Sequence, residues 1–254
     1  MDSIAFSAAV SRALLRKSAG IGMLGEKTLH SALKYYYEPD ETRHEIEFSG
    51  FFADVKNEDG VIEIQTRSLS SLKRKLAAYL PLTAVTVVHP VVRRRRLIYL
   101  DEETGELSKP RLSPKTGSVY DAFWELIRIR EFLPDPNLMV VIPVVDADEY
   151  RTRTEPTRGF KKRRGKSLTK YELVPTELVE ERVFVCGEDW LRLIPPPLLE
   201  KDGFTAAELS RSLKISEDDA RVVCRTLFEA AALKRERVGH GYVYRAASGP
   251  KEAE

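Results

Sequence analysis

Two nearly continuous apolar runs constrain the fold of this chain most strongly. They are TAVTVVHPVV (residues 83–92) and NLMVVIPVVDADEY (residues 137–150). Such runs, without regular polar alternation, are typical of strands that are buried on both faces of a sheet. Amphipathic helical patterns precede and separate them, so the sequence predicts a mixed α/β chain with a mixed sheet.

The region before residue 93 shows a definite order of elements. Leu29, Ala32, Leu33 and Tyr36 recur at helical spacing, and Pro39 ends that helix. Three β-prone runs follow, and then a second helix with Ser68 as its N-cap. The predicted order is therefore helix, three strands, helix and strand, at residues 25–40, 43–50, 51–56, 61–66, 68–80 and 83–92.

The middle of the chain continues this pattern. We predict a hairpin over residues 93–114 that turns at Thr104-Gly105, a long amphipathic helix over residues 118–133, and then the second buried strand. The N-terminal segment has either an amphipathic helix capped by Ser3 or a transit peptide, and the helix is favoured.

From residue 187 the pattern changes, which predicts two domains, residues 1–186 and 187–254. Thr205 with Glu208, and Ser216 with Asp219, mark the starts of two helices. A hairpin around residues 239–241 follows. Two short helices and a hairpin resemble a winged helix-turn-helix domain, which we expect to fold independently of the core. Winged helices bind DNA or other proteins, so this resemblance alone does not decide the function.

Charge and cysteine content bound the environment and partners. Net charge is +2, but residues 151–170 carry nine basic residues and one acid, Glu155, and Arg93 to Arg96 form a second basic cluster. Such clusters attract phosphate backbones, although a solvated loop is an equal alternative. No apolar run is long enough to cross a membrane. Cys186 and Cys224 are isolated in apolar settings, which indicates buried thiols in a cytoplasmic protein.

The hairpin GFFADVKNEDGVIEIQT (residues 50–66) has an unusual polar face. If Glu58 and Asp59 form the turn, Asp54 lies opposite Glu63; if Asp59 and Gly60 form it, Asp54 lies opposite Gln65. Because side chains alternate with period two, either register places Asp54, Glu63 and Gln65 on one face. Closely spaced carboxylates repel unless a cation lies between them, but a solvated polar face is the simpler interpretation of the hairpin alone.

The order of elements and these residues together resemble the PD-(D/E)xK nuclease superfamily, whose core is a restriction endonuclease-like αβββαβ fold. Asp54 takes the position of the motif aspartate, Glu63 that of the motif acid and Gln65 that of the motif lysine. Ala53 replaces the motif proline. Lys56, two residues after Asp54, faces the same side and is a candidate for the missing ammonium.

The resemblance implies metal-assisted phosphodiester hydrolysis. Asp54, Glu63 and a helix carboxylate, Glu26, would hold Mg²⁺ or Mn²⁺, and Gln65 or Lys56 would position the attacking water. The alternative for Glu26 is a favourable interaction with the helix dipole. Candidate nucleic-acid contacts are Arg67, Lys73 and Arg74 near the second helix, and Arg221, Arg225 and Arg237 in the winged helix.

Two hypotheses follow from the sequence. The first is a Mg²⁺-dependent nuclease acting on nucleic acid, with DNA favoured over RNA, and with a winged-helix module that binds the substrate. The second is a non-catalytic DNA-binding or assembly regulator built on a decayed nuclease fold. Both are cytoplasmic and make no membrane contact. The oligomeric state stays open, with a homodimer as one alternative.

Overall fold

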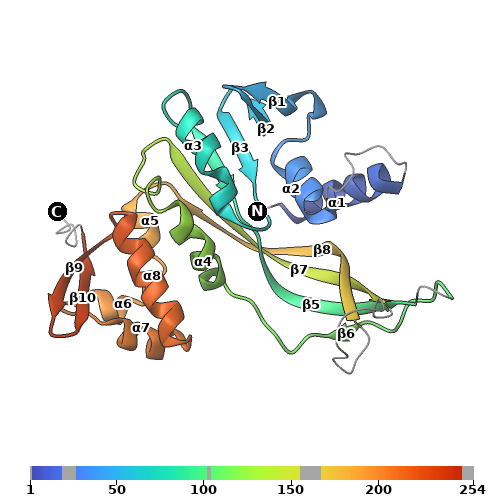
Figure 1. The fold of residues 1–254 in the computed structure, drawn as a ribbon. Helices are drawn as coiled ribbons and strands as arrows, with labels where there is room; N and C mark the ends of the chain where they lie inside the picture. Colours follow the sequence, from blue (N-terminus) through green and yellow to red (C-terminus); the bar gives the residue numbers. More distant parts are fainter. Residues whose placement is uncertain (1, 19–26, 102–103, 155–166, 248–254) are drawn as a thin grey trace, which may run out of the picture. The chain divides into compact units, whose positions relative to one another are not determined.

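The computed structural model describes residues 2–18, 27–101, 104–154 and 167–247 (Figure 1). The chain divides into two compact units. Unit 1 comprises residues 1–42, 91–118 and 143–181, and unit 2 comprises residues 43–90, 119–142 and 182–254. The predicted mixed α/β class with a mixed sheet is confirmed. Each unit combines three separate chain segments, whereas the sequence predicted a single boundary between residues 186 and 187.

Unit 2 contains the predicted three-stranded meander. Strands β1 (His44–Phe48), β2 (Phe51–Asn57) and β3 (Gly60–Ile64) are antiparallel neighbours. Strand β4 (Val85–Val88) then runs parallel to β3, and the first residues of β7 (Leu138–Thr154) run parallel to β4. Val85, Val87, Val140 and Val141 are buried, as the apolar runs predict.

The connection from β3 to β4 supplies the helix that lies over this meander. It begins as a 3-10 helix, η2 (Leu69–Leu72), and continues as α3 (Lys73–Tyr79). Leu69, Leu72, Leu76 and Tyr79 are buried, which confirms the predicted apolar stripe. Ser68 precedes η2, but its side chain makes no capping hydrogen bond. In Figure 1, α3 lies beside β1, β2 and β3.

The apolar run of residues 83–92 is two strands rather than the predicted single strand. It breaks at His89-Pro90, between β4 and β5 (Val91–Leu100). Proline cannot donate a ladder hydrogen bond, which weakens strand pairing at Pro90 and favours a break there. Strand β5 pairs with the later residues of β7, from Val144 onward, in unit 1.

Unit 1 combines two helices with long strands. Helix α1 (Ser3–Ser18) packs on α2 (Thr28–Tyr37) through Ala9, Ala13 and Ala32. Asp2, and not Ser3 as predicted, caps α1, because its Oδ1 accepts the N–H groups of residues 4 and 5 at 2.9 and 3.0 Å.

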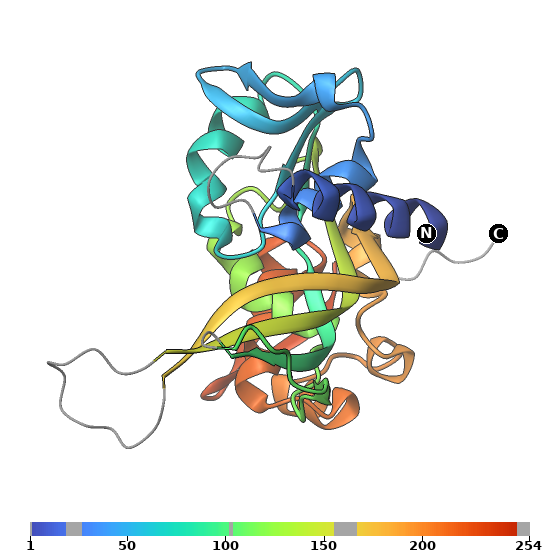
Figure 2. The ribbon, with the colours of Figure 1, turned by 90° about the vertical axis from the view of Figure 1, so that its right-hand side faces the viewer.

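The strands of unit 1 are arranged around β7. Strand β5 pairs with β7 on one side, and β6 (Arg111–Leu112) pairs with β5, which confirms the hairpin that turns near Gly105. Strand β8 (Ser167–Phe184) also pairs with β7, and Figure 2 shows these two strands running side by side.

The predicted long helix at residues 118–133 is broken into short turns: η3 (Val119–Ala122), α4 (Phe123–Leu126) and η4 (Ile127–Ile129). Phe123, Leu126 and Ile129 are fully buried and recur every three residues. This spacing matches the three-residue repeat of a 3-10 helix better than the 3.6-residue repeat of an α-helix.

The C-terminal segment has the predicted winged-helix order. After α5 (Gly187–Leu191) and α6 (Pro196–Leu199) come α7 (Ala206–Leu213) and α8 (Glu217–Glu229), then the hairpin of β9 (Leu233–Val238) and β10 (Gly241–Ala246). The Thr205–Glu208 capping box and the Ser216 cap are both formed. The helix starts predicted at Thr205 and Ser216 are therefore confirmed.

The C-terminal segment shares aromatic contacts with α4 within unit 2. Phe184 stacks on Trp190 with ring centroids 4.0 Å apart, and Phe123 of α4 meets Trp190 edge-on at 6.1 Å. The Trp124 indole N–H donates to Asp219 Oδ1 of α8 at 2.7 Å. In Figure 1, α4 lies beside α8. The described part of the C-terminal segment thus packs against α4 within unit 2.

Across the described ranges, every helix is too short or too polar to span a bilayer.

The shared aromatic core gives a testable prediction. Trp190→Ala removes a buried side chain with 2% exposure, so it should lower the free energy of unfolding of the full chain by about 3–5 kcal/mol. Trp124→Ala is the matched control, because Trp124 is 48% exposed, and it should cost about 1 kcal/mol. Urea denaturation followed by circular dichroism measures both. Equal costs for the two variants would contradict a shared core.

Candidate functional site

The β2–β3 hairpin places Asp54 beside Glu63. Its register pairs Asn57 with Gly60 and Val55 with Ile62, so Asp54 lies opposite Glu63 on the same face. The turn is therefore Glu58-Asp59, the first of the two predicted registers. The common face predicted for these two carboxylates is confirmed.

Gly60 explains why this register is chosen. Its φ is +137°, which L-residues with a side chain rarely adopt, and a Cβ there would lie 2.2 Å from the carbonyl oxygen of Ala84. That carbonyl accepts the N–H of Val61 at 2.9 Å, which joins β3 to the start of β4. Gly60 is thus needed in the strand and is not part of the two-residue turn.

Asp54 uses its carboxylate to hold β3. Its Oδ2 accepts the backbone N–H of Ile64 at 2.7 Å, and the side chain is half-buried. A charge-assisted bond to a backbone N–H fixes the carboxylate in one orientation. Asp54 is therefore held rigidly at the edge of the face that Glu63 shares.

Glu63 is buried and paired with a lysine that sequence reasoning missed. It is 1% exposed, and the Lys75 Nζ lies 2.9 Å from each of its carboxylate oxygens. The same ammonium donates to the carbonyl oxygen of Phe52 at 2.6 Å. Lys75 comes from α3, and its place was visible in the sequence: it lies three residues after Leu72 and four before Tyr79, on the stripe that faces the sheet.

The environment of Glu63 changes its protonation. Burial, and then the charge of Asp54, raise the pKa of Glu63 from 4.5 to about 7, although the Lys75 ammonium acts in the opposite direction. Burial disfavours the carboxylate because it removes the hydration of the charged form. Glu63 therefore titrates near neutral pH, which is unusual for a carboxyl group and typical of functional sites.

The two residues predicted to position the attacking water, Gln65 and Lys56, make hydrogen bonds to other groups of the protein. The Gln65 Nε2 donates to Ser71 Oγ at 2.8 Å, and its Oε1 accepts the Arg67 N–H at 3.0 Å. The Lys56 Nζ donates to the carbonyl of Asn57 at 2.7 Å and lies 5.5 Å from the Phe48 ring. Gln65 thus shapes the turn after β3, and the ammonium that reaches Glu63 belongs to Lys75 and not to Lys56.

The donor set fits a hard divalent cation in one respect. Asp54 and Glu63 provide a pair of carboxylates, and Mg²⁺ is commonly bound by one or two carboxylates plus waters and substrate phosphates. No group of three or more His, Cys, Asp or Glu side chains is placed to hold a metal among the residues that the structure describes. Glu26, the predicted third carboxylate, lies outside the described residues.

The three basic residues near α3 that were predicted to contact nucleic acid differ in exposure and in their side-chain partners. Arg67 is exposed, whereas the Lys73 Nζ lies 2.6 Å from Glu131 Oε1 and the Arg74 guanidinium lies 5.7 Å from the Phe51 ring. In the winged helix, Arg221 is bonded to Glu217 and Asp218, each at 2.8 Å, and Arg225 lies 3.8 Å from Glu229. Arg237 is exposed on β9. The charge of α8 is therefore largely balanced on its own surface.

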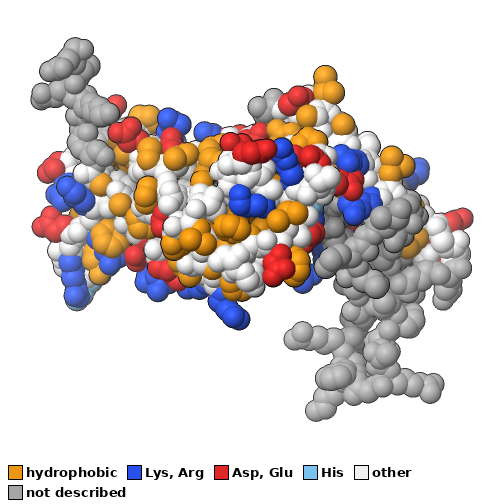
Figure 3. Space-filling view, turned by 90° about the horizontal axis from the view of Figure 1, so that it is seen from above, with side chains coloured by type: hydrophobic (Ala, Val, Ile, Leu, Met, Phe, Trp, Pro, Cys, Tyr) orange, Lys and Arg blue, Asp and Glu red, His pale blue; other side chains and the backbone are white. Residues whose placement is uncertain are grey.

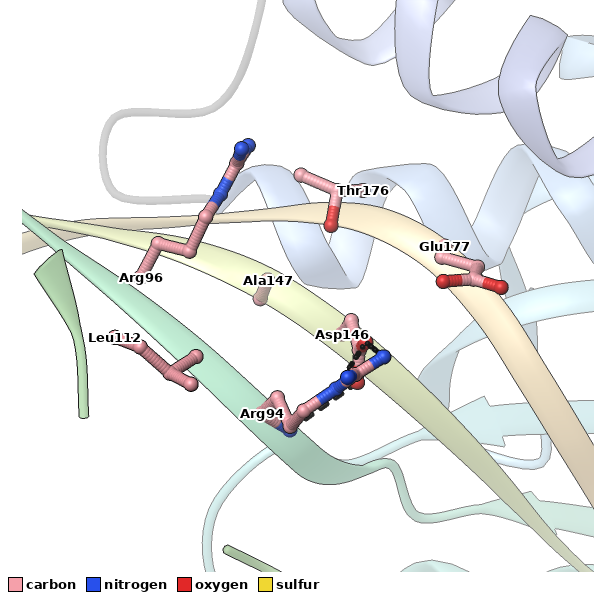
Figure 4. Close-up of a pocket in the computed structure, with 7 residues that line it drawn as sticks. All are labelled: Arg94, Arg96, Leu112, Asp146, Ala147, Thr176 and Glu177. Atoms are coloured by element: carbon pink, nitrogen blue, oxygen red, sulfur yellow. Dashed lines mark hydrogen bonds and ion pairs between the residues drawn. The ribbon is translucent and has the colours of Figure 1, made fainter. Parts of the chain in front are cut away.

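The Arg93–Arg96 cluster is likewise neutralised by β7. Asp146 accepts from Arg93 and Arg94, and Asp148 accepts from Arg96 at 2.6 Å. Hydrogen bonds from Arg93 lower the pKa of Asp146. Arg94, Arg96 and Asp146 line a hollow of about 370 Å³ in unit 1, together with Thr176 and Glu177 of β8 (Figure 4). The hollow thus carries charges of both signs, and phosphate binding by this cluster stays one of two open alternatives.

The face shown in Figure 3 has a similar mixture of charges. On the face in Figure 3, the described Lys and Arg side chains are interspersed with Asp and Glu. The central part of the basic tract, residues 155–166, lies outside the described residues, so the structure does not place its charges.

Cys186 differs from its prediction. It is exposed, and its Sγ lies 3.5 Å from Asp189 Oδ2, whereas Cys224 is buried as predicted. The difference arises because Cys186 occupies the N-cap position of α5, at the end of β8, where the apolar stripe of the strand has ended.

Comparison with known sequences identifies a family. A model described as "Domain of unknown function (DUF8091)" matches residues 27–185. The chain belongs to the DUF8091 family. The match includes β1 to β8 and the Asp54–Glu63–Lys75 site, and the winged-helix segment lies beyond it.

A relative from Treponema pallidum (strain Nichols), called an uncharacterized protein, is 36% identical over 141 residues. The aligned part is 55% of this DUF8091 chain and 56% of the relative, so the chain spans about half of that protein. No solved structure matches the chain.

The raised pKa of Glu63 predicts a specific pH dependence of stability. Because the pKa is higher in the folded state than the unfolded value of 4.5, the stabilisation is present below pH 4.5 and is lost as pH rises through about 7. The free energy of unfolding, relative to Glu63→Gln, should fall by about 2–3 kcal/mol across this window. Urea denaturation of both proteins at several pH values measures it.

Glu58→Gln is the control, because Glu58 is exposed in the turn of the same hairpin. It should leave the pH dependence of the wild type unchanged. A flat difference between wild type and Glu63→Gln would contradict a buried, neutral-titrating Glu63.

Proposed function

We propose that this DUF8091 protein is a metal-dependent nuclease that hydrolyses phosphodiester bonds in DNA. The observation that carries the proposal is the convergence of Asp54, Glu63 and Lys75 from β2, β3 and α3. The chain order around them, α2, β1, β2, β3, α3 and β4, is that of a restriction endonuclease-like αβββαβ core. The parallel pairing of β3 with β4 also agrees with that core.

In this proposal each side chain has a defined role. Asp54 and Glu63 hold Mg²⁺ or Mn²⁺, which would lower the pKa of a bound water and neutralise charge on the phosphate. Lys75 takes the role that the motif lysine has in the superfamily, since it supplies the ammonium that Gln65 lacks. Once a divalent ion displaces it from Glu63, its 23% exposed side chain could hydrogen-bond substrate oxygens.

The winged-helix segment is proposed to add nucleic-acid affinity. Arg237 and Lys234 are exposed on the wing, where cations contact phosphates. The paired arginines of α8 contribute less, because Arg221 already neutralises Glu217 and Asp218.

One observation favours a second candidate, a non-catalytic regulator. Lys75 contacts both oxygens of Glu63 and thus already supplies the positive charge that the carboxylate pair requires. In that case Lys75 is a permanent replacement for the cation. The two candidates therefore differ in whether a divalent ion can displace the ammonium.

A metal titration tests this difference. For the nuclease, Mn²⁺ at about 100 times its Kd should raise the Tm by roughly 5–10 °C, because it binds the folded state selectively. Mn²⁺ should also support cleavage of duplex, branched or single-stranded DNA. Lys75→Met should keep the Mn²⁺ response, since the competing ammonium is gone, but lose cleavage by about 100-fold or more.

Asp54→Asn and Glu63→Gln should lose both the Tm shift and the cleavage, whereas Asp59→Asn, an exposed carboxylate of the same hairpin, should keep both. If Mn²⁺ neither shifts the Tm of the wild type nor supports cleavage of any substrate, the regulator takes the place of the nuclease.

A further inference from the structure

The hydroxyl group of Tyr79 has no partner although it lies in the core beside the site. Tyr79 is 0% exposed, and its hydroxyl makes no hydrogen bond in the structure. The ring is held in place by Phe48 and Phe51, whose centroids lie 5.4 and 6.2 Å away. A buried donor without an acceptor costs free energy, so a group that persists in this state requires an explanation.

Tyr79 lies on the same part of α3 as Lys75, close enough to Glu63 and Asp54 for their charges to act on its hydroxyl. Tyr79 follows Lys75 by four residues and therefore lies on the same face of the helix. Long side chains on a helix lean toward its N-terminus, which here is the direction of Lys75 and Glu63. Burial, and then the charges of Glu63 and Asp54, raise the pKa of Tyr79 to about 12, so the phenol stays protonated and remains a donor.

The other donor at the site is already committed. An ammonium has three N–H groups, and Lys75 directs its own to two oxygens of Glu63 and to the carbonyl of Phe52. The carboxylate of Asp54 accepts the N–H of Ile64 and cannot donate when ionised. In the structure as described, the Tyr79 hydroxyl is thus a buried donor at this site that no protein acceptor occupies.

We propose that the Tyr79 hydroxyl is a positioning residue that donates to a water molecule held at the Asp54–Glu63 pair, where that water belongs to the hydration shell of the divalent cation. The inference rests on the proposed function and extends it to a residue outside the PD-(D/E)xK motif. Mg²⁺ keeps several waters when it binds to one or two carboxylates, so a hydrogen bond to such a water orients the ion without direct ligation.

Mn²⁺ titrations of the Tm of the full chain test the inference. Tyr79→Phe removes the hydroxyl and keeps the ring. Without metal its Tm should equal or exceed that of the wild type, because the lost group has no protein partner. With metal, its Mn²⁺ midpoint should rise about 10-fold, as for other groups that orient a metal through a ligand.

Tyr120→Phe is the matched control, because the Tyr120 hydroxyl donates to the carbonyl of Leu193 at 2.9 Å. It should lower the Tm without metal by about 2–4 °C and leave the Mn²⁺ midpoint unchanged. Opposite behaviour of the two tyrosines would support the inference, since a merely structural hydroxyl affects stability and not metal affinity.

Three outcomes overturn the inference, and they can be told apart. If Asp54→Asn abolishes the Mn²⁺ response but Tyr79→Phe keeps the wild-type midpoint, the role of Tyr79 is wrong and the nuclease proposal stands. If metal-free Tyr79→Phe loses as much Tm as Tyr120→Phe, the hydroxyl has a structural partner. If the wild type does not respond to Mn²⁺, the inference fails together with the proposed function.

Discussion

The ion pair between Lys75 and Glu63 is the interaction on which the arrangement of the meander and its helix depends. A carboxylate that is 1% exposed is strongly disfavoured unless a positive charge and hydrogen bonds compensate it. The Lys75 ammonium supplies both, and it also binds the Phe52 carbonyl of β2. A single side chain of α3 thus fixes the helix to two strands at once, and this sets the positions of Leu76 and Tyr79 over the sheet.

The same interaction makes the site responsive to its ligands. In the proposed function, three species compete to neutralise Glu63: a proton, the Lys75 ammonium and a divalent ion. Burial raises the pKa of Glu63 to about 7, so near neutral pH the protonated and ionised forms of Glu63 are similarly populated. Lys75 is 23% exposed on a flexible stem, and its ammonium can return to water at a modest cost. In the proposed nuclease, a divalent ion that offers stronger coordination would therefore displace the lysine from Glu63.

The sequence predicted the carboxylate pair because side-chain alternation in a hairpin depends on parity, and both possible turns give the same parity for Asp54 and Glu63. It did not identify Lys75, because a charged residue on an apolar stripe is usually assigned to the exposed flank of a helix. The fold was predicted where periodicity is local, as in the meander and in the two capped helices and hairpin at the C-terminus. The prediction was wrong where contacts with other parts of the chain decide the structure, as in the strand break at Pro90 and in the buried 3-10 turns around Phe123.

The charge balance of the C-terminal segment limits how it can contact nucleic acid. The N-terminal turn of α8 carries Glu217, Asp218 and Asp219, which repel phosphate, and Arg221 is committed to the first two of them. Asp219 is in turn bonded to Trp124, so this end of the helix faces α4 and is unavailable for reading base edges. The wing, with Lys234 and Arg237 exposed, presents cations that contact phosphates, and phosphate contacts position a protein without reading sequence. A nucleic-acid contact made through this segment would therefore depend on backbone geometry and salt concentration more than on base sequence.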